Sequence, residues 1–319
     1  MFAVVLVGGF GTRLRPLTNA VPKPLLPLGQ RTILEWMMVH LARGGVTDAV
    51  LALGFKPEPF VAAFPDRTCA GVRLHFAIED APLDTAGAIG FAARSVGLHE
   101  RTEPFVVANG DIVTDLRIAD LVAAHRRHRT DGALATIHLT PVVDPSQYGV
   151  VETQPDGRVT GFVEKPAPGT TASRHVNAGT YVLEASSLDV MPGDAPLSIE
   201  RVTFPHLVQQ QALFALATDD YWLDAGRPDS YLRANLDLIN GRRNDRDDAV
   251  HSSAVLDHEC EVRDSVVGAG ARIGKGARVI GSVIGPRAVI GDSAVVEGSV
   301  ALGDVAASQV VRDALIAPA

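Results

Sequence analysis

Residues 2–9 read Phe2-Ala3-Val4-Val5-Leu6-Val7-Gly8-Gly9, an apolar run that ends in paired glycines. The run is far shorter than the roughly 18 consecutive apolar residues of a membrane span, and no other stretch of the sequence approaches that length. No positive charges precede it, as they would in a signal peptide, so we expect neither secretion nor membrane anchoring. The pattern is typical of a buried β-strand that leads into a loop.

The alternation of strand and helix patterns continues to about residue 240. Short apolar runs predict strands at 4–7, 49–53, 73–78, 105–108 and 133–139, and helical periodicity predicts helices at 33–41, 85–96, 118–129 and 198–210. This order favours an α/β fold with a Rossmann-like, doubly wound mixed sheet and helices on both faces. Ligands of such sheets bind beyond the carboxyl ends of the strands, which directs attention to the loops after Val7 and Ala108.

A repeat with a period of 17 residues follows, with copies that begin at Ser265, Ser282 and Ser299. Aliphatic residues recur about every six positions within it: Val267, Ile273, Val279, Ile284, Ile290, Val296 and Leu302. This spacing predicts a short left-handed parallel β-helix of about three coils, in which each coil buries its apolar face against the next. We therefore expect a first domain at 1–240, a solvated, charge-dense linker at 241–250 and the β-helix at 251–319.

Composition sets the class of protein. The 319 residues suggest about two domains at roughly 150 residues each. Lys and Arg total 29 and Asp and Glu total 37, which gives a net charge of −8. That balance argues against a nucleic-acid-binding protein but leaves room for a local basic pocket that binds a small phosphorylated molecule. The two cysteines, Cys69 and Cys260, have no metal-ligand spacing, and we expect a reduced, cytoplasmic protein.

The glycine loop that follows the first strand reads Gly8-Gly9-Phe10-Gly11-Thr12-Arg13. It is not a Walker A loop, because no Gly-Lys-Ser/Thr follows, and it fails the dinucleotide fingerprint, because Leu14 occupies the third glycine position. Glycines alone would indicate only a turn. Arg13 and Lys23, however, place two cations on a segment stiffened by prolines, and a triphosphate is the natural anion to bind between them.

With Pro22-Lys23-Pro24-Leu25, this loop resembles the signature of the sugar-1-phosphate nucleotidyltransferases. Further motifs occur in the order typical of that family: Asn109-Gly110-Asp111, Tyr148-Gly149-Val150-Val151, Phe162-Val163-Glu164-Lys165-Pro166, Val176-Asn177-Ala178-Gly179 and Tyr221-Trp222-Leu223-Asp224-Ala225-Gly226. The resemblance extends over nearly the whole chain, because the family often carries a hexapeptide-repeat tail. It implies an enzyme that joins a sugar-1-phosphate to a nucleoside triphosphate and releases pyrophosphate.

The resemblance also implies roles for charged residues. Asp111 and Asp224 would together hold Mg²⁺, a hard ion that takes few protein oxygens. Arg13 would hold the β- and γ-phosphates, Lys23 the phosphates at the reacting centre, and Lys165 the phosphate of the sugar. The reaction needs no general base, because the attacking phosphate is already an anion.

By the same matching, the nucleotide-binding residues would be Leu6, Gly8, Gly9, Gly11, Thr12, Arg13, Glu79, Gly87 and Asp111. The sugar-binding residues would be Gly149, Glu164, Lys165 and Asn177. Without the family resemblance, Glu164 is equally compatible with a charged residue on the surface. The segment that begins at Asn177 is equally compatible with a turn.

Two segments of the sequence limit the choice of nucleotide base and of sugar. Glu79 stands where thymidylyl and uridylyl relatives place a glutamine, and a carboxylate only accepts hydrogen bonds, which suits the adjacent N–H donors of guanine. Residues 198–205 resemble mannose-1-phosphate guanylyltransferases. We therefore expect GTP and mannose-1-phosphate as substrates. Asp84 departs from the pattern, because the family usually has glycine at this position. The identity of the nucleotide therefore stays open.

Two alternatives remain: a glucose-1-phosphate (or other sugar-1-phosphate) nucleotidyltransferase that uses dTTP or UTP, and a non-catalytic regulatory subunit of the same architecture. The retained charged residues argue against the second. Acyl transfer by the β-helix is not expected, because its histidines are confined to His251 and His258 near its start. The open end of a solenoid exposes aliphatic rungs, and we expect a homo-oligomer formed through it.

Overall fold

The computed structural model describes residues 1–54 and 57–318. The described chain forms two compact units. The first comprises Met1–Gly9 and Met37–Trp222, and the second comprises Phe10–Trp36 and Leu223–Ala319. The segment that follows the first glycines thus belongs to the same unit as the C-terminal repeat. The domain boundaries expected at residues 240 and 250 stay a prediction.

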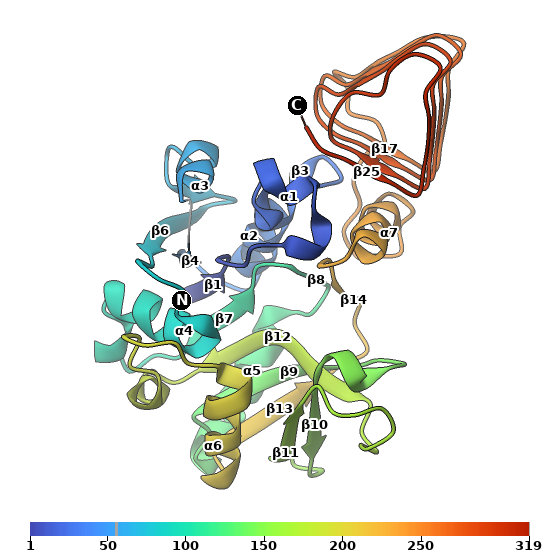
Figure 1. The fold of residues 1–319 in the computed structure, drawn as a ribbon. Coiled ribbons are helices and arrows are strands. Elements are labelled where there is room, and N and C mark those ends of the chain that lie inside the picture. The colour runs from blue at the N-terminus through green and yellow to red at the C-terminus, as the bar shows by residue number, and fades with distance from the viewer. Residues whose placement is uncertain (55–56, 319) are drawn as a thin grey trace. The chain divides into compact units, whose positions relative to one another are not determined.

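The first unit is built on a sheet to which ten of the described strands contribute (Figure 1). These strands are β1 (Phe2–Leu6), β4 (Asp48–Leu53), β5 (Thr68–Cys69), β6 (Val72–Ile78), β7 (Phe105–Asn109), β9 (Ala135–Pro141), β10 (Gly149–Thr153), β11 (Val159–Glu164), β12 (His175–Leu183) and β13 (Leu213–Ala217). Their order is β11-β10-β12-β7-β1-β4-β6-β5, with β9 beside β12 and β13 beside β9. β1 runs parallel to β4 and β7, whereas β12 is antiparallel to β7 and β9, so the sheet is mixed, as predicted.

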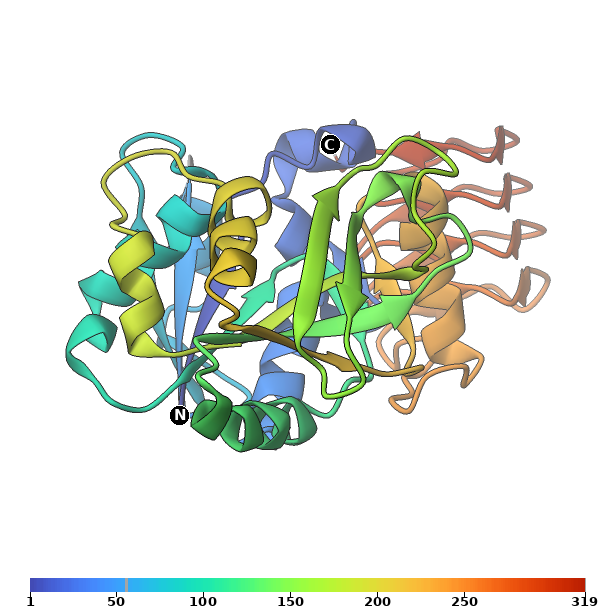
Figure 2. The same ribbon diagram turned by 90° about the horizontal axis from the view of Figure 1, so that it is seen from below.

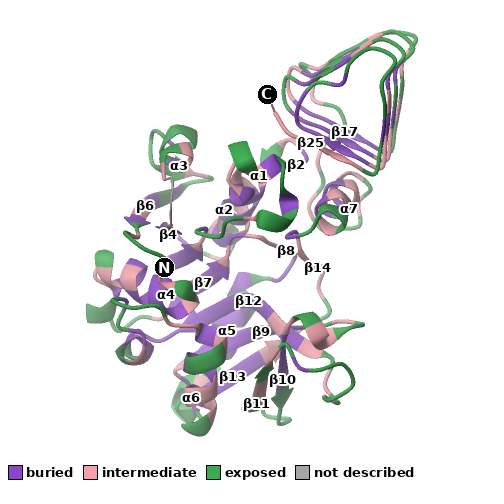
Figure 3. Ribbon diagram, in the orientation of Figure 1, coloured by how far each residue is buried: buried purple, intermediate pink, exposed green. Residues whose placement is uncertain are grey.

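Helices cover both faces of this sheet. Figure 2 shows α4 (Asp84–Ser95) and α6 (Phe204–Gln209) on one face and α5 (Ile118–His128) on the other. Residues of α4 and α6 share one core cluster with the inward side chains of the sheet. Between the two layers of helices the parallel strands are buried (Figure 3), and Val4, Val50 and Val107 are fully enclosed. Burial on both faces explains their continuous apolar runs, and the doubly wound α/β class is confirmed.

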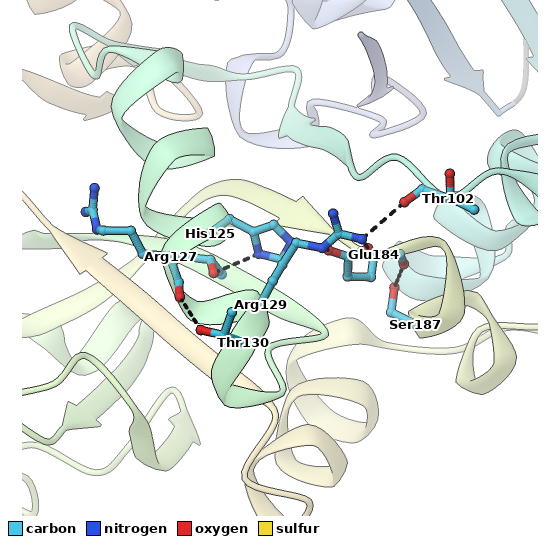
Figure 4. A network of polar contacts seen from close by, with 8 residues as sticks. Thr102, His125, Arg127, Arg129, Thr130, Glu184 and Ser187 are labelled. Carbon is cyan, nitrogen blue, oxygen red and sulfur yellow. Dashed lines mark hydrogen bonds and ion pairs between the residues drawn. The ribbon is translucent and has the colours of Figure 1, made fainter.

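A buried polar network fixes α5 to the sheet (Figure 4). His125 lies 2.9 Å from Glu184 through Nε2 and 2.9 Å from the Thr136 hydroxyl through Nδ1. Arg129, at the end of α5, also pairs with Glu184 and donates to Thr102 O at 3.3 Å. Burial lowers the pKa of His125, although Glu184 acts in the opposite direction. Arg129, just beyond the basic end of α5, thus has a structural partner in Glu184.

The second unit contains a parallel β-helix, whose coils are seen nearly end-on in Figure 1. Its three faces are formed by β15 (Val255–Leu256), β18 (Arg272–Ile273) and β21 (Val289–Ile290); by β16 (Glu261–Arg263), β19 (Arg278–Ile280), β22 (Val295–Glu297) and β24 (Val310–Arg312); and by β17 (Val266–Val267), β20 (Val283–Ile284), β23 (Val300–Ala301) and β25 (Leu315–Ile316). Strand pairs such as Val266↔Val283 and Val283↔Val300 reproduce the predicted period. The β-helix is therefore confirmed.

Two details of the repeat differ from the prediction. The inward neighbour of Ile284 in the next coil is Ala301, so Leu302 lies one residue beyond the expected inward position. The period of six shortens by one at each such corner, and the prediction did not include that shortening here. In the described chain, β25 and β24 also add a further rung, in which Val300 pairs with Leu315. This shorter step hides the rung from a fixed 17-residue period.

The rest of the second unit contains a small hairpin, short helical turns that precede it in the chain, and one longer helix. Its elements are the helical turns η1 (Thr12–Leu14), α1 (Leu17–Ala20) and η2 (Lys23–Leu25), the paired strands β2 (Pro27–Leu28) and β3 (Arg31–Thr32), and helix α7 (Pro228–Ile239). The charge-dense linker is not simply solvated: Arg243 is buried, and the Asp247 carboxylate accepts the Gln30 N–H at 2.7 Å. No helix within 1–54 and 57–318 has the length and apolar character needed to cross a membrane.

Candidate functional site

The loop after β1 lies beside the loops after its two neighbouring strands. Leu6 pairs with Ala52 of β4 and with Asn109 of β7, and Leu6 O accepts the Gly110 N–H at 2.8 Å. A Cβ on Gly8 would lie 3.1 Å from Gly54 N, so the close approach of these two loops favours glycine. Gly8 and Gly9 are exposed, and exposed glycine-rich turns can bind anions through their backbone N–H groups.

Asp111 lies in the turn after β7, two residues beyond the end of the strand. Gly110 before it is buried, and a Cβ there would lie 2.6 Å from Leu6 O, so this turn requires a residue without a side chain. Asp111 itself is only partly buried. Its place, at the carboxyl end of a strand adjacent to β1, is where the doubly wound fold predicts ligand-binding residues.

Glu79 follows directly after β6, and its N–H donates to Leu53 O at 2.8 Å. Its Oε2 accepts the Leu83 N–H at 3.1 Å and so closes the short loop that leads to α4. Burial raises the pKa of Glu79, although the Leu83 hydrogen bond acts in the opposite direction. A partly desolvated carboxylate binds a donor such as the edge of a base more strongly than a fully hydrated one does.

Asp84 occupies the left-handed region of the backbone, with φ of 56°, and is exposed. Aspartate is one of the few residues with a side chain that tolerate this conformation, and its Oδ1 accepts the Thr85 N–H at 2.8 Å. The family's glycine at this position is thus replaced by a residue that can adopt the same backbone. Gly87, predicted to contact the nucleotide, is buried, and a Cβ there would lie 2.5 Å from Ala195 O. Packing by itself accounts for this glycine.

The residues predicted to bind the sugar meet at one end of the β11-β10-β12 segment. Gly149 pairs with Glu164, and Val150 next to it pairs with Val176, the neighbour of Asn177. A Cβ on Gly149 would lie 2.7 Å from the Phe162 ring and 2.9 Å from Glu164 Oε2. The pairing of antiparallel strands thus brings together three motifs that are separate in the sequence.

Lys165 extends this cluster. Its Nζ lies 3.1 Å from Glu164 Oε1, and its N–H donates to Tyr148 O at 3.0 Å. Its φ of 48° places a lysine in the left-handed region, a strained conformation for a long side chain. Such strain often occurs at functional sites, where the surrounding structure imposes it. Here the strand pairing imposes it, because Tyr148 O fixes the backbone of Lys165.

Asn177 shapes a bulge in β12, because its Oδ1 accepts the Gly179 N–H at 3.1 Å and its Nδ2 donates to the Tyr181 hydroxyl at 3.0 Å. Beside it lie two aromatic residues to which the sequence interpretation assigned no role. Trp222 donates from its indole to Ala178 O at 2.9 Å and packs edge-on against Tyr148, with ring centroids 5.4 Å apart. The only signal in the sequence was their position next to the predicted site residues.

The remaining site residues lie in the second unit. Gly11 has φ of 57°, and its carbonyl accepts hydrogen bonds from the Leu14 N–H at 2.9 Å and the Thr18 hydroxyl at 2.8 Å. A Cβ there would lie 2.9 Å from the Thr18 methyl, so the turn needs glycine for both space and conformation. It begins η1, on which Thr12 and Arg13 are exposed. Arg13 is therefore accessible to an anion.

Lys23 is buried, and its Nζ lies 3.7 Å from Asp224 Oδ1. The same oxygen accepts the Gly226 N–H at 2.8 Å. A Cβ on Gly226 would lie 2.7 Å from Asp224 Oδ1 and 2.9 Å from Lys23 Nζ, so glycine is needed for the pair to approach. A lysine is rarely buried without such a partner. The structure thus joins two predicted residues that are far apart in the sequence.

The predicted residues divide between the units: Gly11, Thr12, Arg13, Lys23 and Asp224 belong to the second, and the others to the first. Their roles stay predictions. The chemistry of Asp111 and Asp224 fits Mg²⁺, because carboxylate oxygens are its usual protein ligands and one or two of them suffice when phosphates and water complete the shell. No cluster of three or more His, Cys, Asp or Glu residues with metal-binding geometry occurs within the described ranges.

Comparison with known proteins gives a consistent result. The profile of the nucleotidyl transferase family matches residues 2–241. Mannose-1-phosphate guanyltransferase of Schizosaccharomyces pombe is 41% identical over 235 residues, which cover 73% of this chain and 62% of that protein. Mannose-1-phosphate guanylyltransferase of Mycobacterium tuberculosis is 34% identical over 279 residues, 84% of this chain and 75% of that protein.

The alignment thus spans about three-fifths of the length of the fungal relative. Among solved structures, HddC from Yersinia pseudotuberculosis, complexed with GMP-PN, is 27% identical with a TM-score of 0.59. The match covers 73% of this chain and 97% of that one. Because the family profile spans most of the chain and agrees with its motifs and fold, the chain belongs to the nucleotidyl transferase family.

Proposed function

We propose that this protein joins mannose-1-phosphate to GTP in a Mg²⁺-dependent reaction that gives GDP-mannose and pyrophosphate. The observation that carries the proposal is the ion pair between the buried Lys23 and the partly buried Asp224, in which a cation predicted to bind phosphate is held next to a carboxylate predicted to bind metal. Such a pair suits a reaction that concentrates negative charge at one phosphorus atom. The similarity to mannose-1-phosphate guanyltransferases supports the choice of substrates.

The proposed chemistry is a displacement at phosphorus. An oxygen of the sugar phosphate attacks the α-phosphorus of the nucleotide, the bond to the oxygen that bridges the α- and β-phosphates breaks, and pyrophosphate leaves. Arg13 would bind the β- and γ-phosphates, and Lys23 the phosphates at the reacting centre. Catalysis then consists mainly of positioning and charge neutralisation.

Asp111 and Asp224 would hold the Mg²⁺. When bound, the ion would supply positive charge to the phosphate oxygens. Lys23 beside Asp224 would add a second positive charge at the same carboxylate and keep the side chain of Asp224 oriented. The Gly226 N–H, which donates to the same oxygen of Asp224, also restrains that orientation.

Glu79 would read the base. Its carboxylate is partly buried at the end of β6, and one of its oxygens already accepts the Leu83 N–H. The remaining acceptor capacity suits the donors of a guanine edge. The similarity to a protein whose structure was solved with GMP-PN supports a guanine nucleotide.

Gly149, Glu164, Lys165 and Asn177 would bind the sugar-1-phosphate. Lys165 supplies the positive charge for its phosphate, and Glu164 holds the lysine at 3.1 Å and offers acceptors to hydroxyl groups. The strand pairing that unites these residues supports a common ligand.

The direct test measures pyrophosphate release with matched pairs of substrates. We expect rapid turnover with GTP and mannose-1-phosphate. If that turnover is absent and dTTP or UTP reacts rapidly with glucose-1-phosphate, the protein is instead a glucose-1-phosphate nucleotidyltransferase. Absence of turnover with every pair would favour a regulatory subunit.

Replacing Asp111 by Asn tests the metal role. We expect turnover to fall by about a hundredfold or more, because an amide lacks the charge that binds Mg²⁺, and the increase in nucleotide affinity on addition of Mg²⁺ to be lost. Circular dichroism should remain unchanged. Asp131→Asn, on an exposed carboxylate, is the matched control. Full activity of the Asp111 variant would refute the assignment.

We also propose a homo-oligomer formed through the β-helix and a cytoplasmic location. Exposed aliphatic side chains on the β-helix, including Val255, Val289 and Val310, support the first. The small number of cysteines in the sequence, Cys69 and Cys260, supports the second. Light scattering on purified protein tests the oligomer, and a monomeric mass would contradict it.

A further inference from the structure

The turn that joins β2 to β3 is bonded to helix α7. Asn235 is completely buried, and its Oδ1 accepts the Gly29 N–H at 2.8 Å while its Nδ2 donates to Tyr231 O at 3.0 Å. The Tyr231 hydroxyl donates to Pro27 O. Gly29 itself has φ of 64°, and a Cβ there would lie 2.7 Å from Leu238 of the same helix. Two side chains of α7 therefore hold strand β2 and the first residue of the turn that follows it.

The same turn is bonded to the linker and to the β-helix through Gln30. Its N–H donates to Asp247 Oδ2 at 2.7 Å. Its side-chain amide donates to Asp248 O at 2.9 Å and to Val267 O at 3.2 Å. Val267 belongs to β17, in the first coil of the β-helix. We call Asn235, Tyr231 and Gln30 the hairpin clasp. It joins α7 and the first coil of the β-helix to one two-residue turn.

Two hydrogen bonds connect Lys23 to the open end of the same hairpin, opposite the turn. Lys23 O accepts the Leu26 N–H at 3.0 Å, and Leu26 O accepts the Ile33 N–H at 3.1 Å. Asp224, the partner of Lys23, precedes the first residue of α7, Pro228, by only a few residues. Both members of the pair are thus anchored to one helix, Asp224 by the chain and Lys23 by the clasp.

We propose that Asn235 and Gln30 are positioning residues that set the place of the Lys23 ammonium group relative to Asp224. Through Gln30, the first coil of the β-helix takes part in binding the phosphates of the nucleotide. The inference rests on the phosphate-binding role proposed above for Lys23.

The physical reason is the sensitivity of phosphoryl transfer to geometry. Displacement of a charged group by about 1 Å can reduce the rate about a hundredfold. Lys23 extends from a single helical turn, and the clasped hairpin follows that turn directly in the chain. Loosening the clasp frees the Lys23 backbone without altering the lysine itself.

The first test replaces Gln30 or Asn235 by Ala in the full-length protein. We expect kcat to fall about tenfold, while the KM for the sugar-1-phosphate, whose proposed ligands lie in the other unit, changes by less than twofold. Asn240→Ala, at the exposed end of α7, is the matched control and should leave both constants unchanged. Gln30 is only partly buried, so its variant remains informative if the Asn235 variant does not fold.

The second test is a double-mutant cycle with Lys23→Ala, read out as nucleotide affinity by calorimetry. If Gln30 acts through Lys23, Gln30→Ala weakens nucleotide binding by about tenfold in the native background and by less than twofold when Lys23 is absent. A purely structural role would give the same factor in both backgrounds and would overturn the inference.

The cycle uses whichever of GTP, UTP, dTTP and ATP the unmodified protein binds most tightly. Binding of a nucleotide other than GTP would disprove the proposed substrate and leave the cycle intact. Equal factors in the two backgrounds would disprove the clasp and leave the substrate intact. Binding of none of the four nucleotides would disprove both.

Discussion

His138 lies in the middle of β9, with its imidazole buried and its Nε2 2.9 Å from the Thr218 hydroxyl. Burial and, to a smaller extent, the proximity of His40 together lower the pKa of His138 to about 4. The folded protein therefore holds this side chain neutral at a pH where the unfolded chain protonates it. Stability from the neutral form is complete above pH 6.5 and is lost as the pH falls toward 4.

Replacing His138 by Gln should therefore reduce the acid sensitivity of the protein. Between pH 7.5 and 5.0, we expect this histidine to cost about 2 kcal/mol of the free energy of unfolding, since its pKa is about 4 when folded and about 6.5 when unfolded. Urea unfolding at both pH values measures the loss, which should be smaller in the variant by that amount. His258→Gln, on an exposed side chain, is the control. Equal losses in the variant and the native protein would contradict the assignment.

At the scale of elements, helix α4 shows how a sequence pattern can have two explanations. Gly87 was predicted from the family to contact nucleotide, but Gly87 and Gly90 also form a surface against which residues 191–197 pack backbone to backbone. A Cβ on Gly90 would collide with Met191 O. The Thr85 hydroxyl accepts the Ile199 N–H at 2.8 Å and donates to Glu200 at 2.8 Å, so the same face continues to the start of the helix.

Gly90→Ala should consequently destabilise the protein, although alanine is the better helix former. We expect a loss of about 2 kcal/mol or more, because the neighbouring atoms are backbone and cannot rotate away. Thermal unfolding followed by circular dichroism measures it. Ser95→Ala, at the end of the same helix, removes only a local hydrogen bond to Ala92 O and should cost less than 1 kcal/mol. A stabilised Gly90 variant would show that the contact yields easily.

The parallel strands of the sheet are the elements that the sequence patterns predicted best. The parallel strands β1, β4, β6 and β7 were predicted to within one or two residues. Burial on both faces gives β1, β4 and β7 an apolar run. In β6, buried Val72, Leu74 and Ala77 lie between more exposed residues. The predicted helix at 198–210 consists of a π-helical turn, Ile199–Thr203, followed by α6. Strands β10 to β13 and helix α7 were not predicted as secondary structure. Their residues are only partly buried, or they overlap with motifs that were interpreted as functional.

At the scale of the whole molecule, the β-helix depends on contacts between successive coils. Ser265, Ser282 and Ser299 form a buried ladder, in which each hydroxyl accepts an N–H from the next coil; Ser282 Oγ accepts the Ser299 N–H at 3.1 Å. Each coil is stabilised mainly by its neighbours. A defect in one rung should therefore remain within the β-helix.

Ser282→Ala should lower the free energy of unfolding of the β-helix by about 1–3 kcal/mol, because the Ser299 N–H loses its buried acceptor. Hydrogen exchange followed by mass spectrometry should show faster exchange in β20 and β23 and no change in β7 or β9 of the other unit. Ser252→Ala, at an exposed position before the first coil, is the control. Uniformly faster exchange across the chain would show that the units unfold together.

The sequence by itself determined the class of fold, the period of the β-helix and the motifs of the nucleotidyl transferase family, because each is written in local spacing or in short runs of residues. Only the tertiary structure decided which of these residues meet: Lys23 with Asp224, Glu164 with Gly149, and Asn235 with the turn at Gly29. These contacts join segments that are distant in the chain, and their geometry depends on how closely two backbones approach. Local spacing carries no record of that distance.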